Sequence, residues 1–475
     1  MAPLRRDWIP GPVDNARRRV GDWPGLRCPF RCSSHSLPTS VFALVGGGVE
    51  RATQLWRFVV VGIQPWGLVE DLVAAAGSWA KDLDRIIAAA GPAAVADLLV
   101  AEIRQRLCVP RGAAGAAVCL TIAHGTRRYE WHVTFKEDQA DVTPGPAGAP
   151  VAGIGYELTD LIRLLYAPRP GYVSTSREVD AKTWPWPEAA DEGDEDGGER
   201  LQEMVRRGEA TREEISRRGR ERFDVIAKAV HAVITACEPS ARPLSDLAVQ
   251  YGSDKWGCLH WYTPHYQRHF ADLRHEPLRI LEIGIGGFDQ DAVGGESLYM
   301  WQEFFPRALV YGLDIFPKPA VTGPRIRTVV GDQNDPAFLH ELAVAAGPFD
   351  IIIDDGSHIN EHVSTSFAHL FPHVRPGGWY IIEDLHTAYW PAFGGDARPG
   401  TDGTSVALLK EQLDRLHHEE HLDPGHPELA NPSHPSEVLV YHNLAFLRKG
   451  NNREAGIPAW IKAQASRRAA PESGR

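Results

Sequence analysis

Cysteine, methionine and long apolar runs are scarce in this chain of 475 residues, which has six cysteines and three methionines. Only Cys28 and Cys32 lie close together, and we interpret their spacing as incidental, because it lacks the paired pattern of a zinc or redox site. Reduced thiols in the cytoplasm are therefore expected. No run of about 18 apolar residues occurs, which predicts that no segment spans a membrane.

Positive charge is also in deficit. The net charge of −12 argues against a nucleic-acid partner, because binding to phosphates needs a basic patch. Hydrophobic residues make up 43% of the chain, which is enough for globular cores. A chain of this length is expected to form two domains plus linkers. These properties favour an enzyme that acts on a small molecule.

The N-terminal part changes character after about residue 52. Prolines and clustered arginines interrupt residues 1–52, and no apolar stretch follows the arginines as it would in a signal peptide. We predict that this segment is a disordered extension. Residues 53–175 show helical periodicity followed by alternating apolar residues and turn glycines, which indicates helices and an antiparallel meander. This order predicts a small α+β domain.

Residues 176–200 are rich in proline and glycine, and seven acidic residues lie between positions 188 and 199. Such a stretch buries too little apolar surface to fold alone, so we predict an acidic linker. A helix is expected over residues 201–237, and it would pack against the following domain through four apolar residues. These are Ile215, Phe223, Ile226 and Val230. Residues 461–475 are predicted to be a disordered tail.

The C-terminal half begins with a strand and a glycine turn, RILEIGIGG, at residues 279–287. Gly284 and Gly286 would allow the backbone to approach a cofactor closely. The turn departs from the G-x-G-x-x-G pattern, which disfavours a nicotinamide-dependent dehydrogenase. A second strand ends at Asp314, where an acidic residue typically binds ribose hydroxyls. A third strand leads to Asp332 and Gln333, which are expected to flank an adenine.

Two acidic pairs follow the next two strands, Asp354-Asp355 after FDIII and Glu383-Asp384 after GWYII. Carboxylates at the C-terminal ends of neighbouring parallel strands converge on one crevice. Asp355, Glu383 and Asp384 would supply hard oxygen ligands for Mg²⁺. His358 would lie beside them as a candidate base. The alternative interpretation is two acidic loop ends and a helix-capping aspartate.

The ordered segments resemble the class I S-adenosylmethionine-dependent methyltransferases. They are most similar to the metal-dependent sugar O-methyltransferases of macrolide biosynthesis, over roughly residues 240–450. The matching text includes YGSDKWGCLHWYTPHY, LEIGIGGFDQDAVGG, GDQND, IDDGSH and GGWYIIEDLHTAYWPAFGG. The resemblance implies an α/β, Rossmann-like methyltransferase domain at residues 201–460, with a smaller α+β auxiliary domain before it.

The resemblance also implies the cofactors and the roles of the site residues. S-adenosylmethionine and Mg²⁺ would bind, His358 would be the base, and Asp355, Glu383 and Asp384 would hold the metal. The expected cofactor contacts are Glu282, Gly284, Gly286, Asp314, Asp332, Gln333 and Asp355. The acceptor would be a glycosylated polyketide, and the chain would form a homo-oligomer, as a tetramer, in which the auxiliary domain covers a neighbour's active site.

Two other functions remain open at this point. A phenol or catechol could be the acceptor with the same metal chemistry. A non-catalytic protein could instead bind an apolar ligand and carry a degenerate methyltransferase domain, although Asp355, His358, Glu383 and Asp384 are all present.

Two further clusters of polar and aromatic residues stand out in the sequence. The first cluster could line the binding site of the cofactor or of the acceptor, or it could form a packed aromatic loop. It consists of Tyr251, Asp254, Lys255, His260 and Tyr266. The second cluster is predicted to lie at the surface rather than to bind a metal. It consists of His417, His418, His421, His426 and His434.

Overall fold

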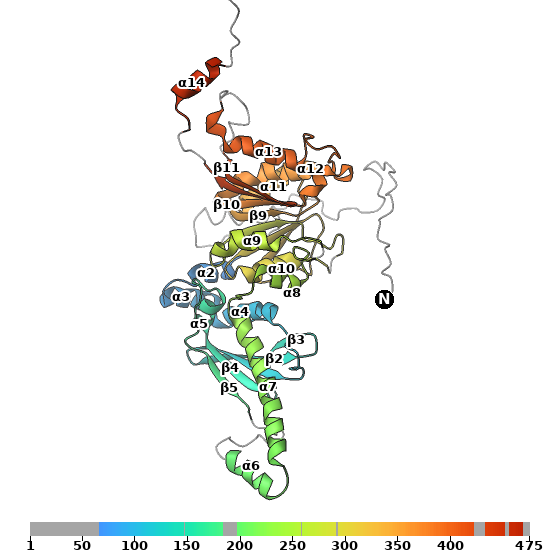
Figure 1. Ribbon diagram of the computed structural model, residues 1–475. Coiled ribbons are helices and arrows are strands. Elements are labelled where there is room, and N and C mark those ends of the chain that lie inside the picture. Colours follow the sequence, from blue (N-terminus) through green and yellow to red (C-terminus); the bar gives the residue numbers. More distant parts are fainter. Residues whose placement is uncertain are drawn as a thin grey trace, which may run out of the picture. The chain divides into compact units, whose positions relative to one another are not determined.

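The structure is a computed structural model that describes residues 66–183 and 197–468, apart from positions 147, 258, 291–292, 422–432 and 452–455 (Figure 1). The predicted extension, residues 1–52, lies outside the described residues, and so does most of the acidic run of the linker. From Thr53 onward the chain forms one compact unit.

The N-terminal domain has the predicted α+β architecture. Its five-stranded sheet has the order β3-β2-β1-β4-β5, in which β1 pairs in parallel with β4 and the other pairs are antiparallel. The strands are β1 (Ala117–His124), β2 (Arg127–Phe135), β3 (Ala140–Pro144), β4 (Ala152–Glu157) and β5 (Glu178–Ala181). The helices are α2 (Leu68–Ala75), α3 (Ala80–Ala90), α4 (Pro92–Arg106) and α5 (Leu158–Leu165). The antiparallel pairing of β1 with β2 and of β2 with β3 confirms the predicted meander.

No single helix in the described part of the chain is long and apolar enough to cross a membrane. Helices α3 and α4 reach that length and composition only as a pair, which is bent by 102°.

Three predictions about the segments that link and follow the domains were wrong. The predicted linker contributes β5 to the sheet and begins α6 (Gly197–Arg206). Helix α7 (Arg212–Cys237) packs on α4, α5, β1 and β4 of the N-terminal domain, not on the domain that follows. Small apolar residues in its second half make this packing possible, whereas Phe223 is 56% exposed. Helix α14 (Ala459–Arg468) extends into the predicted tail.

The C-terminal domain has the predicted doubly wound sheet, with strand order β11-β12-β10-β9-β6-β7-β8. The five strands from β10 to β8 are parallel, and β12 and β11 add an antiparallel edge. The strands are β6 (Arg279–Ile283), β7 (Leu309–Asp314), β8 (Ile326–Val330), β9 (Phe349–Asp354), β10 (Val374–Glu383), β11 (His434–Tyr441) and β12 (Leu444–Gly450).

Helices cover both faces of this sheet (Figure 1). One face packs against α8 (Leu244–Tyr251), α9 (Thr263–Phe270) and α10 (Glu296–Phe304). The other packs against α11 (Pro336–Ala346), α12 (Asn360–Leu370) and α13 (Ser405–Leu416). Because both faces are buried, parallel strands such as β9 and β7 contain continuous apolar stretches, at Ile351–Ile353 and Leu309–Leu313 respectively.

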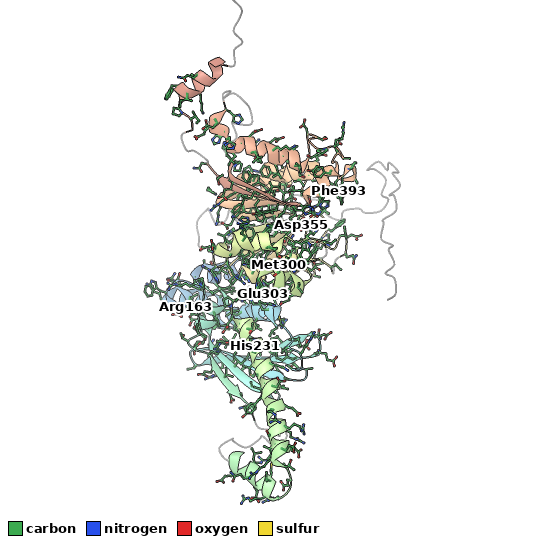
Figure 2. The ribbon with its side chains drawn as sticks, viewed as in Figure 1. Arg163, His231, Met300, Glu303, Asp355 and Phe393 are labelled. Atoms are coloured by element: carbon green, nitrogen blue, oxygen red, sulfur yellow. The ribbon has the colours of Figure 1, made fainter. Side chains whose placement is uncertain are left out.

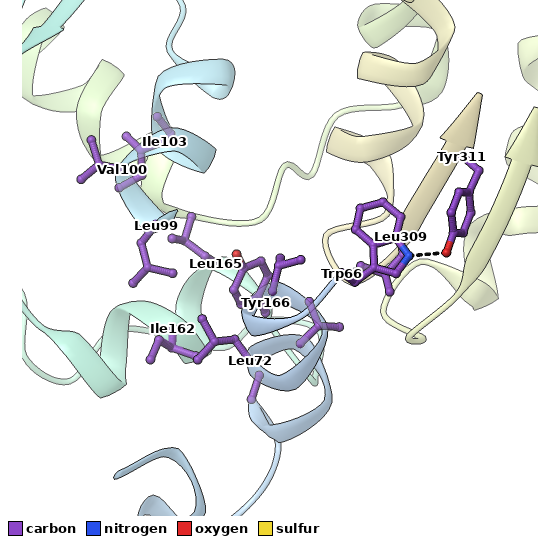
Figure 3. Packing of buried hydrophobic residues seen from close by; sticks show 14 of the residues in the cluster. Trp66, Leu72, Leu99, Val100, Ile103, Ile162, Leu165, Tyr166, Leu309 and Tyr311 are labelled. Carbon is purple, nitrogen blue, oxygen red and sulfur yellow. Dashed lines mark hydrogen bonds between the residues drawn. The ribbon is translucent and has the colours of Figure 1, made fainter. Parts of the chain in front are cut away.

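Buried polar contacts connect the N-terminal domain with the sheet edge at β7 and β8. The Trp66 indole donates a hydrogen bond of 2.6 Å to the Tyr311 hydroxyl (Figure 3). Arg325, which is fully buried, donates from Nε to Glu102 Oε1 over 2.7 Å and also reaches the carbonyl of Phe305. Removing Glu102 would leave the buried charge of Arg325 without its carboxylate partner, whereas Glu102 also pairs with Arg106 over 3.4 Å.

The strand order reverses between β6 and β9, and the candidate site lies at this reversal. Ligands of open α/β sheets bind outside the carboxyl ends of the strands at such a reversal. The glycine turn follows β6, the Asp355 loop follows β9, and the Glu383-Asp384 pair ends β10 next to them.

Candidate active site

The loops after β6 and β9 touch through their backbones. Gly284 has a φ of 92°, and a Cβ atom there would lie 2.1 Å from the carbonyl oxygen of Asp355, the residue after β9. Only glycine fits this contact. Asp355 is labelled in Figure 2. Gln333 supports the same loop, since its Oε1 accepts from the Ser357 amide over 2.7 Å and its Nε2 donates to Asp354 over 3.2 Å.

Asp355, His358 and Asp384 converge as predicted. Each offers a potential ligand atom, and these atoms lie within 4.8 Å of one another. His358 Nε2 lies 3.6 Å from Asp384 Oδ2. Both His358 and Asp384 have a positive φ, 55° and 57°, which L-residues rarely adopt. Such strain is typical of functional sites, where the surrounding structure holds it in place.

Glu383 is buried and is not part of this three-residue group, although it shares the Lys255 ammonium with Asp355. Its Oε1 accepts hydrogen bonds from Lys255 Nζ over 2.8 Å and from the Tyr266 hydroxyl. Burial, followed by the charge of Asp355, raises the pKa of Glu383 well above its usual value. Coordination of a metal by Glu383 therefore stays a prediction, and its observed partners assign it a place in the buried layer beneath the cluster.

Lys255 is the centre of that layer. Its fully buried ammonium lies 2.5 Å from Asp355 Oδ2, 2.8 Å from Glu383 Oε1 and 3.2 Å from Glu282 Oε1. Asp355 and Glu383 accept hydrogen bonds from this ammonium, whereas Glu282 Oε1 forms only an ion pair with it and has no hydrogen-bond partner among the described residues. Burial by itself would lower the pKa of Lys255, but the charges of the three carboxylates outweigh burial and raise it well above its usual value.

Glu282 is fully buried behind the glycine turn. Its Oε2 accepts from the Ser297 hydroxyl over 2.9 Å and from the Trp301 indole over 3.1 Å. Burial raises the pKa of Glu282 to about 7, and the charge of Lys255 opposes that rise. These contacts make Glu282 a partner of Lys255, and a direct contact between Glu282 and the cofactor stays a prediction.

The other predicted cofactor residues lie around the same edge of the sheet. Asp314 closes the glycine turn, because its Oδ2 accepts from the Ile285 amide and its Oδ1 from the Phe316 amide, each over 2.9 Å. Asp332 is exposed and accepts from the Asn334 amide over 2.8 Å. Gly286 has a φ of 81°. Cofactor contacts at these positions stay predictions.

The aromatic segment before α9 contributes both to the site and to packing. Besides Lys255 and Tyr266, it brings His260 Nδ1 to 3.6 Å from Asp384 Oδ1. Tyr262, which sequence reasoning missed, donates to Asp384 Oδ1 over 2.7 Å. Tyr251 is remote from this group and hydrogen-bonds Glu303 instead.

Asp254 is more peripheral than the sequence suggested, since its nearest ionic partner is His260 at 3.9 Å. His386, in the 3-10 helix η6 (Leu385–Tyr389), packs edge-on against Trp390 with ring centroids 4.4 Å apart. Its Nδ1 is buried without a hydrogen-bond partner among the described residues, and burial lowers the pKa of His386.

The predicted surface histidine cluster forms no three-residue group suited to a metal within the described part of the chain. His434 nevertheless contradicts the prediction of a surface position, because it is buried on β11 and stacks on His418 with ring centroids 3.9 Å apart.

Comparison with known proteins identifies the relatives of this chain. The family model "MycE methyltransferase N-terminal" matches residues 69–177. The chain is 42% identical over 411 residues to demethylmacrocin O-methyltransferase of Streptomyces fradiae, an alignment that covers 86% of this chain and 97% of the relative. It belongs to this family of O-methyltransferases. Mycinamicin VI 2''-O-methyltransferase of Micromonospora griseorubida is also 42% identical, over 83% of this chain and 93% of that protein.

A solved structure supports membership of the family. MycE methyltransferase from the mycinamycin biosynthetic pathway, in complex with Mg, SAH and mycinamycin VI, superposes with a TM-score of 0.72 at 39% identity. The match covers 85% of this chain and all of that one, so it includes both the N-terminal domain and the doubly wound sheet.

Proposed function

We propose that this O-methyltransferase family member transfers a methyl group from S-adenosylmethionine to a deoxysugar hydroxyl of a glycosylated, macrolide-type polyketide, with Mg²⁺ as cofactor. The observation that carries the proposal is the convergence of Asp355, His358 and Asp384 beside the glycine turn. Two comparisons support the proposal. The chain is 42% identical in sequence to demethylmacrocin O-methyltransferase, and its fold is similar to that of a structure that holds Mg, SAH and mycinamycin VI.

The donor set fits the metal. Asp355 and Asp384 offer carboxylate oxygens, which are the ligands that Mg²⁺ prefers, and Glu383 is the predicted third acidic ligand. Bound there, Mg²⁺ would lower the pKa of an acceptor hydroxyl and help to fix its position. A sugar with two neighbouring hydroxyls suits such a site, because both oxygens can serve as ligands.

The chain's own residues then hold the reactants and take up the proton. S-adenosylmethionine would supply the methyl group as a sulfonium. His358 is assigned the proton of the acceptor hydroxyl, which its Nε2 would accept beside Asp384. Lys255 keeps the side chains of Asp355 and Glu383 in place from beneath. Alignment of the acceptor oxygen with the methyl group supplies much of the rate, since transfer needs a linear approach at about 3 Å.

The acceptor class can be tested with isotopically labelled cofactor. The chain is incubated with S-adenosylmethionine carrying a ¹³C-methyl group and either a macrolide whose deoxysugar has free hydroxyls or a catechol. We expect the label on a sugar oxygen by NMR and little transfer to the catechol. Efficient methylation of the catechol, with none of the sugar, would contradict the proposal. A homo-oligomer and a cytoplasmic location stay predictions.

A further inference from the structure

An apolar groove lies next to the candidate active site. Its volume is about 540 Å³, and its walls come from η6, α13 and the hairpin of β11 and β12. We refer to it as the α13 groove. Its apolar walls include Leu385, Leu409, Leu413, Val438 and Val440. Lys410 is the one lysine, arginine or acidic residue among the described residues that line it.

The α13 groove begins where the acidic cluster ends. His386 and Asn443 line the groove, and both border Asp384. His386 follows Asp384 by two residues on η6. The Tyr262 hydroxyl lies within hydrogen-bonding distance of both Asp384 Oδ1, at 2.7 Å, and the carbonyl oxygen of Asn443, at 3.2 Å. When the polar end of a ligand contacts Asp384, the rest of that ligand can therefore lie in the α13 groove.

The groove leaves large apolar side chains in water. Leu413 is 46% exposed, Val440 57% and Tyr389 43%. Contiguous exposed apolar surface that forms a concavity beside polar groups is typical of a ligand site, and the groove volume lies within the usual range of about 300–1,000 Å³. The mostly apolar walls favour an apolar occupant over a phosphate or another strongly ionic ligand.

We propose that the α13 groove binds the apolar aglycone of the acceptor while the attached sugar reaches the acidic cluster. This inference rests on the proposed function, since it is the sugar that the active site holds. The aglycone of a glycosylated polyketide is a large apolar body one glycosidic bond away from the sugar. Its burial against the groove removes apolar surface of both partners from water, which is the main source of affinity for such a ligand. The groove thus selects the acceptor by its aglycone, independently of methyl transfer.

The test uses the double variant Leu413→Gln with Val440→Thr. Both replacements keep the shape and the local preference for helix or strand, so the fold should persist. For the glycosylated macrolide we expect KM to rise roughly tenfold, which corresponds to about 1.4 kcal/mol, with kcat unchanged. For the methyl glycoside of the same sugar, which has no aglycone, kcat/KM should not change. Val249→Thr on α8, where Val249 is 68% exposed, is the matched control and should alter neither.

Calorimetry with the aglycone alone separates this inference from the proposed function. Wild type should bind the aglycone without any sugar, and the double variant should bind it roughly tenfold more weakly. That result would support the groove even if no sugar were methylated. No aglycone binding by wild type, or equal KM and affinity in the double variant, would overturn the inference. Dissociation of an oligomer by light scattering, with equal loss of rate on both acceptors, would also overturn it, because the groove would then be an interface between copies.

Discussion

Replacing Lys255 by methionine should destabilise the protein strongly. Lys255 is fully buried, and its ammonium lies within 3.2 Å of an oxygen of Glu282, Asp355 and Glu383. Methionine has a similar length, so the change removes the charge and leaves little empty space. Removing one partner of a buried ion pair typically costs about 3–5 kcal/mol, because the remaining charge is left without compensation. At about 2 °C per kcal/mol for a large domain, the melting temperature should fall by roughly 6–10 °C.

The loss should grow with pH. Burial raises the pKa of Glu282 from 4.5 to about 7, and Lys255 is the first group that opposes the rise. A folded-state pKa above the unfolded one gives stability that is present below pH 4.5 and is lost as the pH rises through the folded-state pKa. Without Lys255 the pKa of Glu282 rises further. At low pH Glu282 is then protonated and neutral, so the variant has one uncompensated buried charge fewer. We therefore expect a smaller loss at pH 5.5 than at pH 8.

Scanning calorimetry of the whole chain in EDTA at both pH values measures this. The matched control is Lys318→Met, since Lys318 is also buried but donates to backbone carbonyls, including Gln290 at 3.2 Å and Val293 at 3.4 Å. Its loss should be equal at the two pH values, because carbonyls do not titrate. A melting temperature of Lys255→Met close to wild type, or an equal loss at pH 5.5 and pH 8, would refute the assigned role.

Three other changes probe different parts of the chain. His358→Ala should lower turnover by roughly 10²–10⁴-fold, while the affinity for S-adenosylmethionine, measured by calorimetry, should not change. If turnover stays near the wild-type value, His358 is not the base and His386 becomes the next candidate. Asp314→Ala should weaken S-adenosylmethionine by roughly 1–3 kcal/mol, and unchanged affinity would make Asp314 purely structural. Burial would raise the pKa of Asp160, but hydrogen bonds from Ser174 and other groups lower it, so its stabilisation is present above pH 3.8 and is lost as the pH falls. Asp160→Asn should cost roughly 1.5–3 kcal/mol in urea unfolding at neutral pH and less in acid, and equal stability at neutral pH would contradict this.

The parallel sheet could be predicted because its signals are local. An apolar run followed by glycine or an acidic residue marks each strand and its carboxyl end, as at Gly284, Asp314 and Asp355. The topology then brings these ends together whatever the intervening sequence. The same logic placed His358 and Asp384 in one cluster.

Contacts across long sequence separations could not be predicted in this way. Lys255 and Asp355 are 100 residues apart, and nothing near Lys255 in the sequence signals a buried ion pair. The buried partners of Glu383 were missed for the same reason, because Lys255 and Tyr266, which donate to its carboxylate, are more than 100 residues away in the sequence. Helix α7 was misplaced for a related reason: its apolar stripe fits either domain, and only the three-dimensional packing on β1 and β4 decides between them.

We propose that Asp355 and Asp384 form a divalent-metal site at the strand-order reversal, with His358 beside it as the base. Titration with Mn²⁺, followed by its electron paramagnetic resonance signal, tests this most directly. Wild type should bind one Mn²⁺ that Mg²⁺ displaces. Asp355→Asn and Asp384→Asn should each weaken binding at least tenfold, about 1.4 kcal/mol, because each removes a ligand charge. His358→Ala should retain the metal. Unchanged Mn²⁺ affinity in both aspartate variants would contradict the account.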